Sequence, residues 1–213
     1  MIRITLFVSV FMIYSCKSNS TKHQIHLNQK QSSTLGTNEE PALTYIDIQP
    51  FAGLPKDEAL YLYNELKKIY PNVILSKSIN LPHFAFYIPR NRFKADSLIH
   101  FLSARTQHNH ITIGLTNKDI SSTKGQIPDW GIMGLGLEPG NACVVSTFRL
   151  SKSQLLDQLF KVSVHELGHT EGLPHCHVKT CFMRDAEGKN TTNEETEFCA
   201  SCKWYLDKRG WRL

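Results

Sequence analysis

The length and composition of the chain are those of an ordinary globular protein. It has 213 residues, of which 41% are hydrophobic and 20% charged, so one domain with or without tails is expected and a wholly disordered chain is excluded. The formal net charge is +5, but no long run of Lys and Arg concentrates it, so no nucleic-acid partner is expected. The six Cys and ten His are the unusual feature of the composition.

Residues 1–15 have the pattern of a signal peptide. Arg3 precedes an apolar run, residues 4–14, that is far shorter than the roughly 20 residues of a membrane-spanning helix. Residues 13–16, Ile-Tyr-Ser-Cys, resemble the cleavage box of bacterial lipoproteins, which predicts cleavage before Cys16 and acylation of its thiol. We therefore expect an extracytoplasmic lipoprotein of the cell envelope, held at the membrane by its lipid anchor alone. An ordinary signal peptide or a short buried segment is the alternative.

Residues 16–42 predict a lipidated, flexible tether. They are rich in Ser, Thr, Asn, Gln and Lys and have neither the helical nor the strand period of apolar residues. About 25 such residues would span on the order of 25–30 Å, enough to hold a folded domain clear of a membrane surface.

Residues 43–213 are predicted to form one domain in which strands and helices alternate. Alternating apolar residues predict strands, and apolar residues three or four apart predict helices. Strands are expected at residues 45–48, 72–79, 110–115, 130–137 and 142–148, the last two forming a hairpin, and helices at 56–70, 92–102 and from about 154 to 172. Ser151 and Gln154 have capping-box spacing at the start of the last helix. This order predicts an α/β (α+β) fold with one mixed β-sheet sandwiched by helices.

The last predicted helix carries a metal-binding pattern. His165 and His169 stand four residues apart, so both imidazoles lie on one helix face and can reach the same metal ion. Gly172 ends the helix, and His175 follows as a candidate third nitrogen ligand. Three protein ligands leave one position of zinc open for water, which is the arrangement of a catalytic site. Histidines with no metal on a capped helix are the alternative, and this long spacing makes that alternative rare.

Glu166 gives this pattern its expected chemistry. Zinc would activate a water molecule and polarise the scissile carbonyl. Glu166 directly follows a ligand, where its carboxylate can take the proton of the water and later deliver it to the leaving amine. The sequence therefore predicts peptide-bond hydrolysis with Glu166 as general base and acid.

Four cysteines follow the third histidine. They are Cys176, Cys181, Cys199 and Cys202, spaced Cys-x4-Cys and Cys-x2-Cys. This spacing suits a closed tetrahedral zinc site. Two disulfides are the alternative, because an exported protein meets an oxidising compartment, and His177 is a further candidate ligand. Spacing alone does not separate these interpretations. Cys143 is left over and is predicted to be a small buried apolar residue.

The block from Val164 to Cys202 resembles the archaemetzincins, a family of zinc metallopeptidases within the metzincins. The shared pattern is His-Glu-x-x-His-x-x-Gly-x-x-His-Cys-x4-Cys-x-Met, followed by Cys-x-x-Cys. Residues 142–149, just before the helix, are similar as well. The resemblance implies a metzincin-like fold with a zinc-binding active-site helix over residues 43–213.

The resemblance also implies a role for each matching residue. His165, His169 and His175 would bind the catalytic zinc, with Glu166 as the base. Met183 would be the methionine of the turn beneath the metal. Cys176, Cys181, Cys199 and Cys202 would hold a second, structural zinc, so two Zn²⁺ ions per chain are expected. Asp185 stands where some other metzincins have a Tyr, so the sequence names no second oxyanion donor.

Other polar and aromatic residues receive plainer interpretations. Trp130 and residues 131–136 predict either an edge strand that aligns an extended peptide or a buried hairpin. Asp119 and Asp129 are predicted as loop carboxylates, and the glutamates of residues 194–197 as a solvated face.

These patterns together predict a monomeric, lipid-anchored zinc metallopeptidase that acts on peptide or protein substrates. The alternative is a lipoprotein whose zinc sites only stabilise a peptide-binding fold. Glu166 favours the enzyme, because a purely structural zinc site has no use for a carboxylate at that position.

Overall fold

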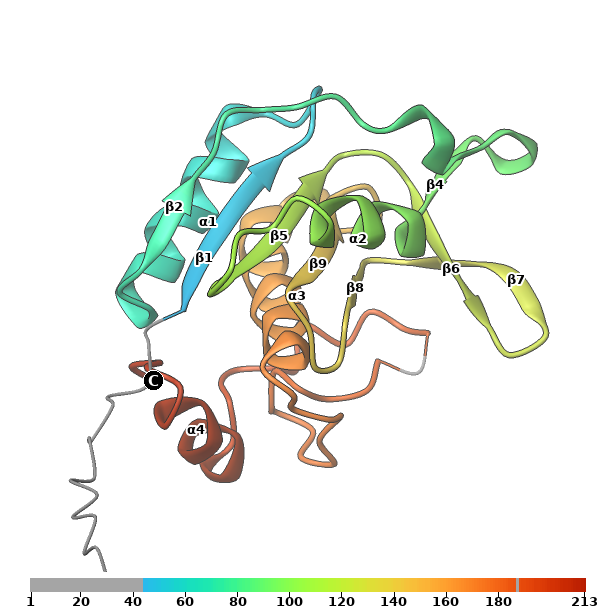
Figure 1. The fold of residues 1–213 in the computed structure, drawn as a ribbon. Helices are drawn as coiled ribbons and strands as arrows, with labels where there is room; N and C mark the ends of the chain where they lie inside the picture. Colours follow the sequence, from blue (N-terminus) through green and yellow to red (C-terminus); the bar gives the residue numbers. More distant parts are fainter. Residues whose placement is uncertain (1–43, 187) are drawn as a thin grey trace, which may run out of the picture. The chain divides into compact units, whose positions relative to one another are not determined.

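The computed structural model describes residues 44–186 and 188–213 (Figure 1). The predicted signal peptide, the tether and Cys16 lie outside these residues. Among the described residues, no helix is both long and apolar enough to cross a membrane.

A five-stranded mixed sheet organises the domain (Figure 1). In spatial order its strands are β2 (Val73–Leu75), β1 (Tyr45–Pro50), β5 (His110–Thr116), β9 (Ala142–Ser146) and β8 (Gly134–Gly136). The first four are parallel, and β8 runs antiparallel to β9. The predicted hairpin before the last helix is thus present, and β8 is an edge of the sheet.

Helices cover both faces of this sheet. On one face α1 (Lys56–Ile69) and α3 (Leu155–Thr170) share an apolar core with Ile46, Ile48 and Ile113. On the other face α2 (Ala95–Ser103) packs against Ala142 and Val144. All four residues of β9 from Ala142 to Val145 are fully buried because they alternate between the two cores. This continuous apolar run is typical of a strand buried on both faces, and the sandwich predicted from the sequence is confirmed.

The prediction of a single sheet is wrong. A second, four-stranded sheet has the order β3 (Phe86–Tyr87), β4 (Arg92–Lys94), β6 (Ile120–Lys124) and β7 (Ile127–Ile132). The predicted strand at residues 130–137 is divided at Met133, since β7 pairs with β6 and β8 pairs with β9. These short strands, several of them polar, lack the long apolar alternation on which strand prediction rests.

Two predicted boundaries and one predicted helix cap also differ in the structure. The strand expected at residues 72–79 ends at Leu75, and the helix expected from residue 92 begins at Ala95, after β4. The predicted capping box is absent at the start of α3, where Gln154 makes no side-chain cap. Instead a 3₁₀ turn over Lys152–Gln154 precedes α3, and the Ser151 backbone N–H donates to Gln158 Oε1 at 2.9 Å.

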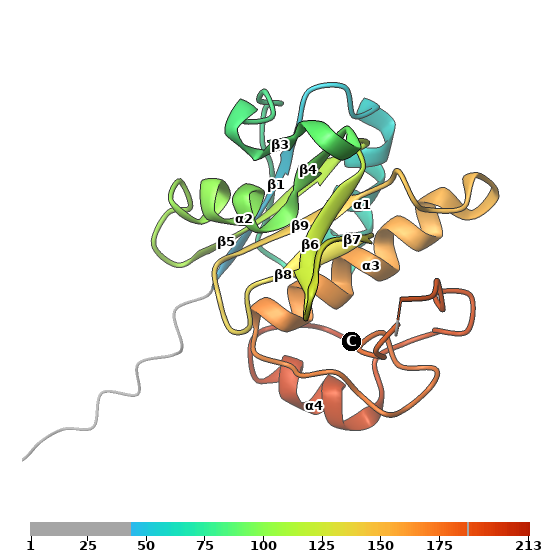
Figure 2. The ribbon, with the colours of Figure 1, turned by 90° about the vertical axis from the view of Figure 1, so that its right-hand side faces the viewer.

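The segment after α3 folds back beneath that helix (Figure 2). It contains one regular helix, α4 (Ala200–Asp207), among the described residues. Phe198, Leu206 and Trp211 are almost fully buried in the same core as α1 and α3. The Trp211 ring lies 5.4 Å from the ring of Tyr70, measured between centroids. These apolar contacts hold the cysteine-containing segment against the active-site helix.

Candidate active site

The end of α3 sets the direction of the chain that follows. Gly172 has φ +95°, a left-handed conformation that favours glycine. Its N–H donates to the His169 carbonyl at 2.8 Å, and the Leu173 N–H donates to the Gly168 carbonyl at 2.9 Å. These two bonds form a Schellman motif, which closes the helix. The prediction that Gly172 ends the helix is confirmed, and the turn brings His175 back toward α3.

Three histidines converge at this turn. His165, His169 and His175 each offer a ring nitrogen, and these nitrogens lie within 4.8 Å of one another. The Nε2 atoms of His165 and His169 are 3.1 Å apart. Two nitrogens that bind one tetrahedral zinc at about 2.0–2.1 Å are separated by about 3.3 Å. The spacing of these two side chains therefore fits a shared zinc ion.

Hydrogen bonds on the opposite side of the rings orient the histidines. The Nδ1 atom of His165 lies 2.6 Å from the Phe182 carbonyl, and that of His169 lies 2.8 Å from the Leu173 carbonyl. A carbonyl can only accept, so Nδ1 carries the proton and Nε2 keeps its lone pair for a metal. The Nδ1 atom of His175 lies 3.6 Å from a carboxylate oxygen of Asp185. This donor set fits zinc.

Burial keeps the imidazoles in the form that binds metals. Desolvation, together with the neighbouring His169, lowers the pKa of His165 to about 3, and desolvation also lowers the pKa of His169. Both side chains are therefore neutral at physiological pH, as zinc ligation requires.

Glu166 is buried beside the histidines, beneath the edge strand β8. Burial raises its pKa to about 8. A Cβ atom at Gly134 would lie 2.5 Å from Glu166 Oε1, so β8 passes closer to the carboxyl group than any side chain would allow. Gly136 also lies close to α3, since a Cβ atom at this position would lie 3.2 Å from the Cβ of His169. The two glycines thus allow the sheet edge to lie directly on the active-site helix.

Met183 lies in the segment that supports the histidines from the other side. It is fully buried, and its thioether packs against Gly168 of α3. Its carbonyl accepts a hydrogen bond of 2.7 Å from the Cys176 N–H, while the preceding residue, Phe182, accepts from His165. The segment Phe182–Met183 therefore fixes both α3 and the chain that follows His175.

The four predicted cysteines form one cluster. The sulfur atoms of Cys176, Cys181, Cys199 and Cys202 lie within 4.8 Å of one another, and all four thiols are free. The separation of Cys176 Sγ and Cys199 Sγ is 3.7 Å, close to the roughly 3.8 Å expected for two thiolates on a tetrahedral zinc. His177 is not a member of this cluster. The donor set and its spacing fit a second zinc ion.

The thiols of the cysteine cluster differ in pKa: burial raises the pKa of Cys181 and of Cys202, whereas the pKa of Cys199 is lowered. Burial acts to raise the pKa of Cys199, but hydrogen bonds from the Cys202 backbone N–H and from the neighbouring thiols lower it to about 7. The Cys199 N–H also donates to Cys181 Sγ at 3.3 Å. Such N–H···S contacts are typical of sulfur atoms placed to carry negative charge, which metal ligation requires.

The histidines open into a cleft of about 550 Å³. One wall is the β6–β7 hairpin with β8, and the other is the segment of described residues from Arg184 to Glu195. A metal ion bound by three side chains at the base of a cleft keeps a position for water and for a substrate group. The fold and the cleft thus define a metal-dependent hydrolase of the metallopeptidase class.

Comparisons with known proteins agree with this class. Residues 56–208 match the sequence profile of peptidase family M54. The chain is 28% identical over 175 residues to the archaemetzincin of Haloquadratum walsbyi, covering 76% of this chain and 98% of that protein. The chain therefore belongs to the M54 family, the archaemetzincins, and is a zinc metallopeptidase.

Two crystal structures of archaemetzincins share the fold. The structure from Archaeoglobus fulgidus, complexed with malonate, matches with a TM-score of 0.66 and 27% identity over 76% of this chain and 99% of that chain. The structure from Methanopyrus kandleri matches with a TM-score of 0.67 and 23% identity over 82% of this chain and 98% of that chain.

Some residues near the cleft differ from their sequence-based interpretation. Glu195 is not part of a solvated face: it is 5% exposed, accepts a hydrogen bond of 2.8 Å from Thr191 and lines the cleft. Asp119 lies in the loop between β5 and β6, as predicted, but it is buried, and Asp129 lies within β7 and is therefore not a loop carboxylate. Both form ion pairs with distant basic residues, which spacing along the chain does not reveal. Cys143 is fully buried, as predicted.

Several charged residues of the cleft, among them Glu138 and Arg149, have no role in the sequence-based prediction. A carboxylate oxygen of Glu138 lies 3.3 Å from His169 Nδ1. Arg149 ends the segment 142–149 that resembles the archaemetzincins, and this resemblance was the only available signal.

Proposed function

We propose that the enzyme hydrolyses peptide bonds with His165, His169 and His175 as the ligands of its catalytic zinc and Glu166 as general base and acid. The observation that carries this proposal is the convergence of the histidines on one point, with the Nδ1 atoms of His165 and His169 already occupied by carbonyls. Zinc at this point would supply Lewis-acid activation of a water molecule and of the scissile carbonyl. The substrate class is a peptide or protein.

The protein groups around this point have distinct tasks. Without a metal, burial raises the pKa of Glu166 to about 8, and the positive charge of a bound zinc would favour its carboxylate form. That carboxylate would accept a proton, hold it and return it to the leaving amine. The close passage of β8 over Glu166 keeps bulk water from one side of the carboxylate. As the exposed edge of the sheet, β8 can also align an extended peptide by strand addition.

We propose a structural role for the second cluster. Cys176, Cys181, Cys199 and Cys202 would hold a second zinc, giving two ions per chain. Closed four-thiolate sites stabilise folds outright, and here the ion would join the chain after His175 to the start of α4. Met183 would serve as the methionine of the turn beneath the catalytic metal, a role supported by its burial against Gly168.

The cellular location is a separate proposal that rests on the N-terminal sequence alone. Acylation of Cys16 would anchor the enzyme to a membrane outside the cytoplasm, and the tether would give its cleft access to peptides. The domain would act there as a monomer.

Paired variants of Glu166 and His169 test the proposed function. Glu166→Ala should keep its zinc, because the three ligands remain, and should lose on the order of 10²–10⁴-fold of peptide hydrolysis. His169→Ala should lose metal and activity together. The measurements are elemental analysis and cleavage of a mixed peptide library near neutral pH. Cleavage by zinc-loaded Glu166→Ala at the wild-type rate would exclude this role, and a zinc-loaded wild type that cuts nothing would favour a non-catalytic peptide-binding protein.

A further inference from the structure

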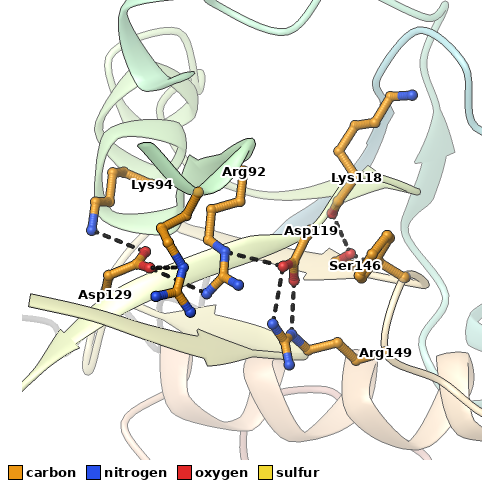
Figure 3. A network of polar contacts seen from close by, with 9 residues as sticks. Arg92, Lys94, Lys118, Asp119, Asp129, Ser146 and Arg149 are labelled. Carbon is orange, nitrogen blue, oxygen red and sulfur yellow. Dashed lines mark hydrogen bonds and ion pairs between the residues drawn. The ribbon is translucent and has the colours of Figure 1, made fainter. Parts of the chain in front are cut away.

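A network of charged side chains joins β4, β7 and the loops that precede β6 and α3 (Figure 3). Asp119, directly before β6, accepts a bidentate pair from Arg149, with Nε–Oδ1 at 2.7 Å and Nη2–Oδ2 at 3.0 Å. On its other side Asp119 faces Arg92, whose Nε lies 3.1 Å from Oδ2. Arg92 also reaches Asp129 at 3.4 Å. The Arg149 guanidinium is therefore fixed in position rather than mobile in solvent.

Within the described residues this network carries excess positive charge. Its basic members are Arg90, Arg92, Lys94 and Arg149, and its carboxylates are Asp119 and Asp129. Four basic groups thus share two carboxylates. A desolvated cation with a surplus of neighbouring cations favours a further anion.

Arg149 is the member of this network that faces the cleft. Its side chain is 34% exposed, whereas Arg92 is 11% exposed and does not line the cleft. A guanidinium has five N–H donors, and Asp119 occupies two of them. The remaining donors, including both on Nη1, have no acceptor among the described residues.

The backbone of β7 leaves room for this guanidinium. It lies flat against Gly131, where even a Cβ atom would collide with Nη2 and Cζ of Arg149. Lys124 also lines the cleft, with its Nζ 5.4 Å from the centre of the Trp130 ring. By contrast, the carboxylates of Glu138 and Asp185 lie beside the histidines. The charged residues that line the cleft are thus of both signs, with Arg184 and Lys189 on the wall opposite β7.

From these contacts we infer that Arg149 is a specificity-determining residue that binds a carboxylate of the peptide substrate. The inference rests on the proposed peptidase function and names the substrate class of the same cleft. Gly131, which touches Arg149, and Gly134, which touches Glu166, are three residues apart, so their Cα atoms are separated by at most about 10 Å. An extended peptide with its scissile bond beside Glu166 reaches Arg149 within about three residues. The carboxylate is that of the chain end or of an Asp or Glu side chain.

Matched peptide libraries test this inference and separate the two sources of the carboxylate. One pair of libraries differs only in a free or amidated C-terminus, and a second pair exchanges Asp and Glu for Asn and Gln. The wild type should cleave one acidic library about ten- to hundredfold more efficiently, in kcat/KM, than its neutral partner, as a charge-assisted hydrogen bond predicts. Arg149→Met should bring this preference, taken as the ratio of kcat/KM for the acidic and the neutral library in the same variant, down to about one.

Two further variants separate recognition from stability. Arg92→Met removes a contact to the same Asp119 carboxylate without touching the cleft, so the preference should survive. Gly131→Ala keeps Arg149 but displaces its guanidinium, so the preference should fall even if Arg149→Met does not fold. Equal cleavage of both members of each library pair by the wild type, or the same preference in Arg149→Met, would overturn the inference. So would an equal loss of the preference in Arg92→Met.

A binding measurement keeps the inference testable if the proposed function fails. Isothermal titration of the zinc-loaded wild type with the same free-acid and amidated peptides reports recognition without turnover. Tighter binding of an acidic peptide, lost in Arg149→Met, would support carboxylate recognition in a protein that does not cut. Equal binding of acidic and neutral peptides would overturn it.

Discussion

At the scale of single residues, the position of the Glu166 carboxylate depends on two glycines of β8 that have no side chain to occupy its space. Gly134 and Gly136 of β8 face α3, and any Cβ at Gly134 would meet the carboxyl group of Glu166. The low exposure of Glu166, 7%, follows from this contact. Gly134 and Gly136 thus determine where the proposed base lies, because they leave room for its carboxylate between β8 and α3.

Gly134→Val tests this arrangement. The new side chain would displace the Glu166 carboxylate, so peptide hydrolysis should fall on the order of 10²-fold or more, while the three histidines keep their zinc. Gly125→Asn is the matched control, because a Cβ there meets nothing within 4 Å and Asn tolerates its φ of +57°. Activity and zinc content are measured in both. An unchanged rate in Gly134→Val would show that Glu166 does not need its present position.

At the scale of secondary-structure elements, the sequence predicts best what has a local cause. The helical spacing of α3, the left-handed Gly172 and the unbroken apolar run of β9 are each visible in the sequence, and the structure has all three. The second sheet was not predictable in this way. Its strand β6 reads Ile-Ser-Ser-Thr-Lys. Its position depends on parallel pairing with β4, where Phe93 lies opposite Ile120, and on the buried Asp119.

The segment from Cys176 to α4 is also determined by long-range contacts. Between these points the described chain has turns and isolated bridges but no strand or long helix. Its shape depends on Phe198 in the core and on the four thiols that meet at one point. The spacing of the cysteines indicated such a cluster, but only their position in space separates four free thiols from two disulfides.

The cysteine cluster gives a prediction at this scale. The purified protein should contain two zinc ions per chain, and Cys202→Ser should contain one and be less stable, because closed zinc sites contribute directly to folding. Thiol titration of the denatured protein without reductant should find Cys143 and all four cluster cysteines free. Cys143→Ser is the control and should keep both ions. One zinc per chain together with a single free thiol would instead establish two disulfides.

At the scale of the whole molecule, the described domain has no apolar helix that could hold it in a bilayer. The sequence offers Cys16, which follows an apolar run too short to span a bilayer. Stable anchoring of lipoproteins depends on their acyl chains. The proposed location of the enzyme therefore depends on acylation of the Cys16 thiol.

Cys16→Ala should release the enzyme from membranes without changing its chemistry. Expressed in a bacterial host that processes lipoproteins, the wild type should incorporate labelled fatty acid and sediment with the membrane fraction. The variant should take up no label and lose membrane retention, because the stable anchoring of lipoproteins depends on their acyl chains. Zinc content and peptide hydrolysis should be the same in both, since Cys16 precedes the domain that carries the histidines and the cysteine cluster. An unlabelled wild type that stays in the membrane fraction as firmly as Cys16→Ala would contradict lipidation, and would leave the proposed peptidase chemistry unaffected.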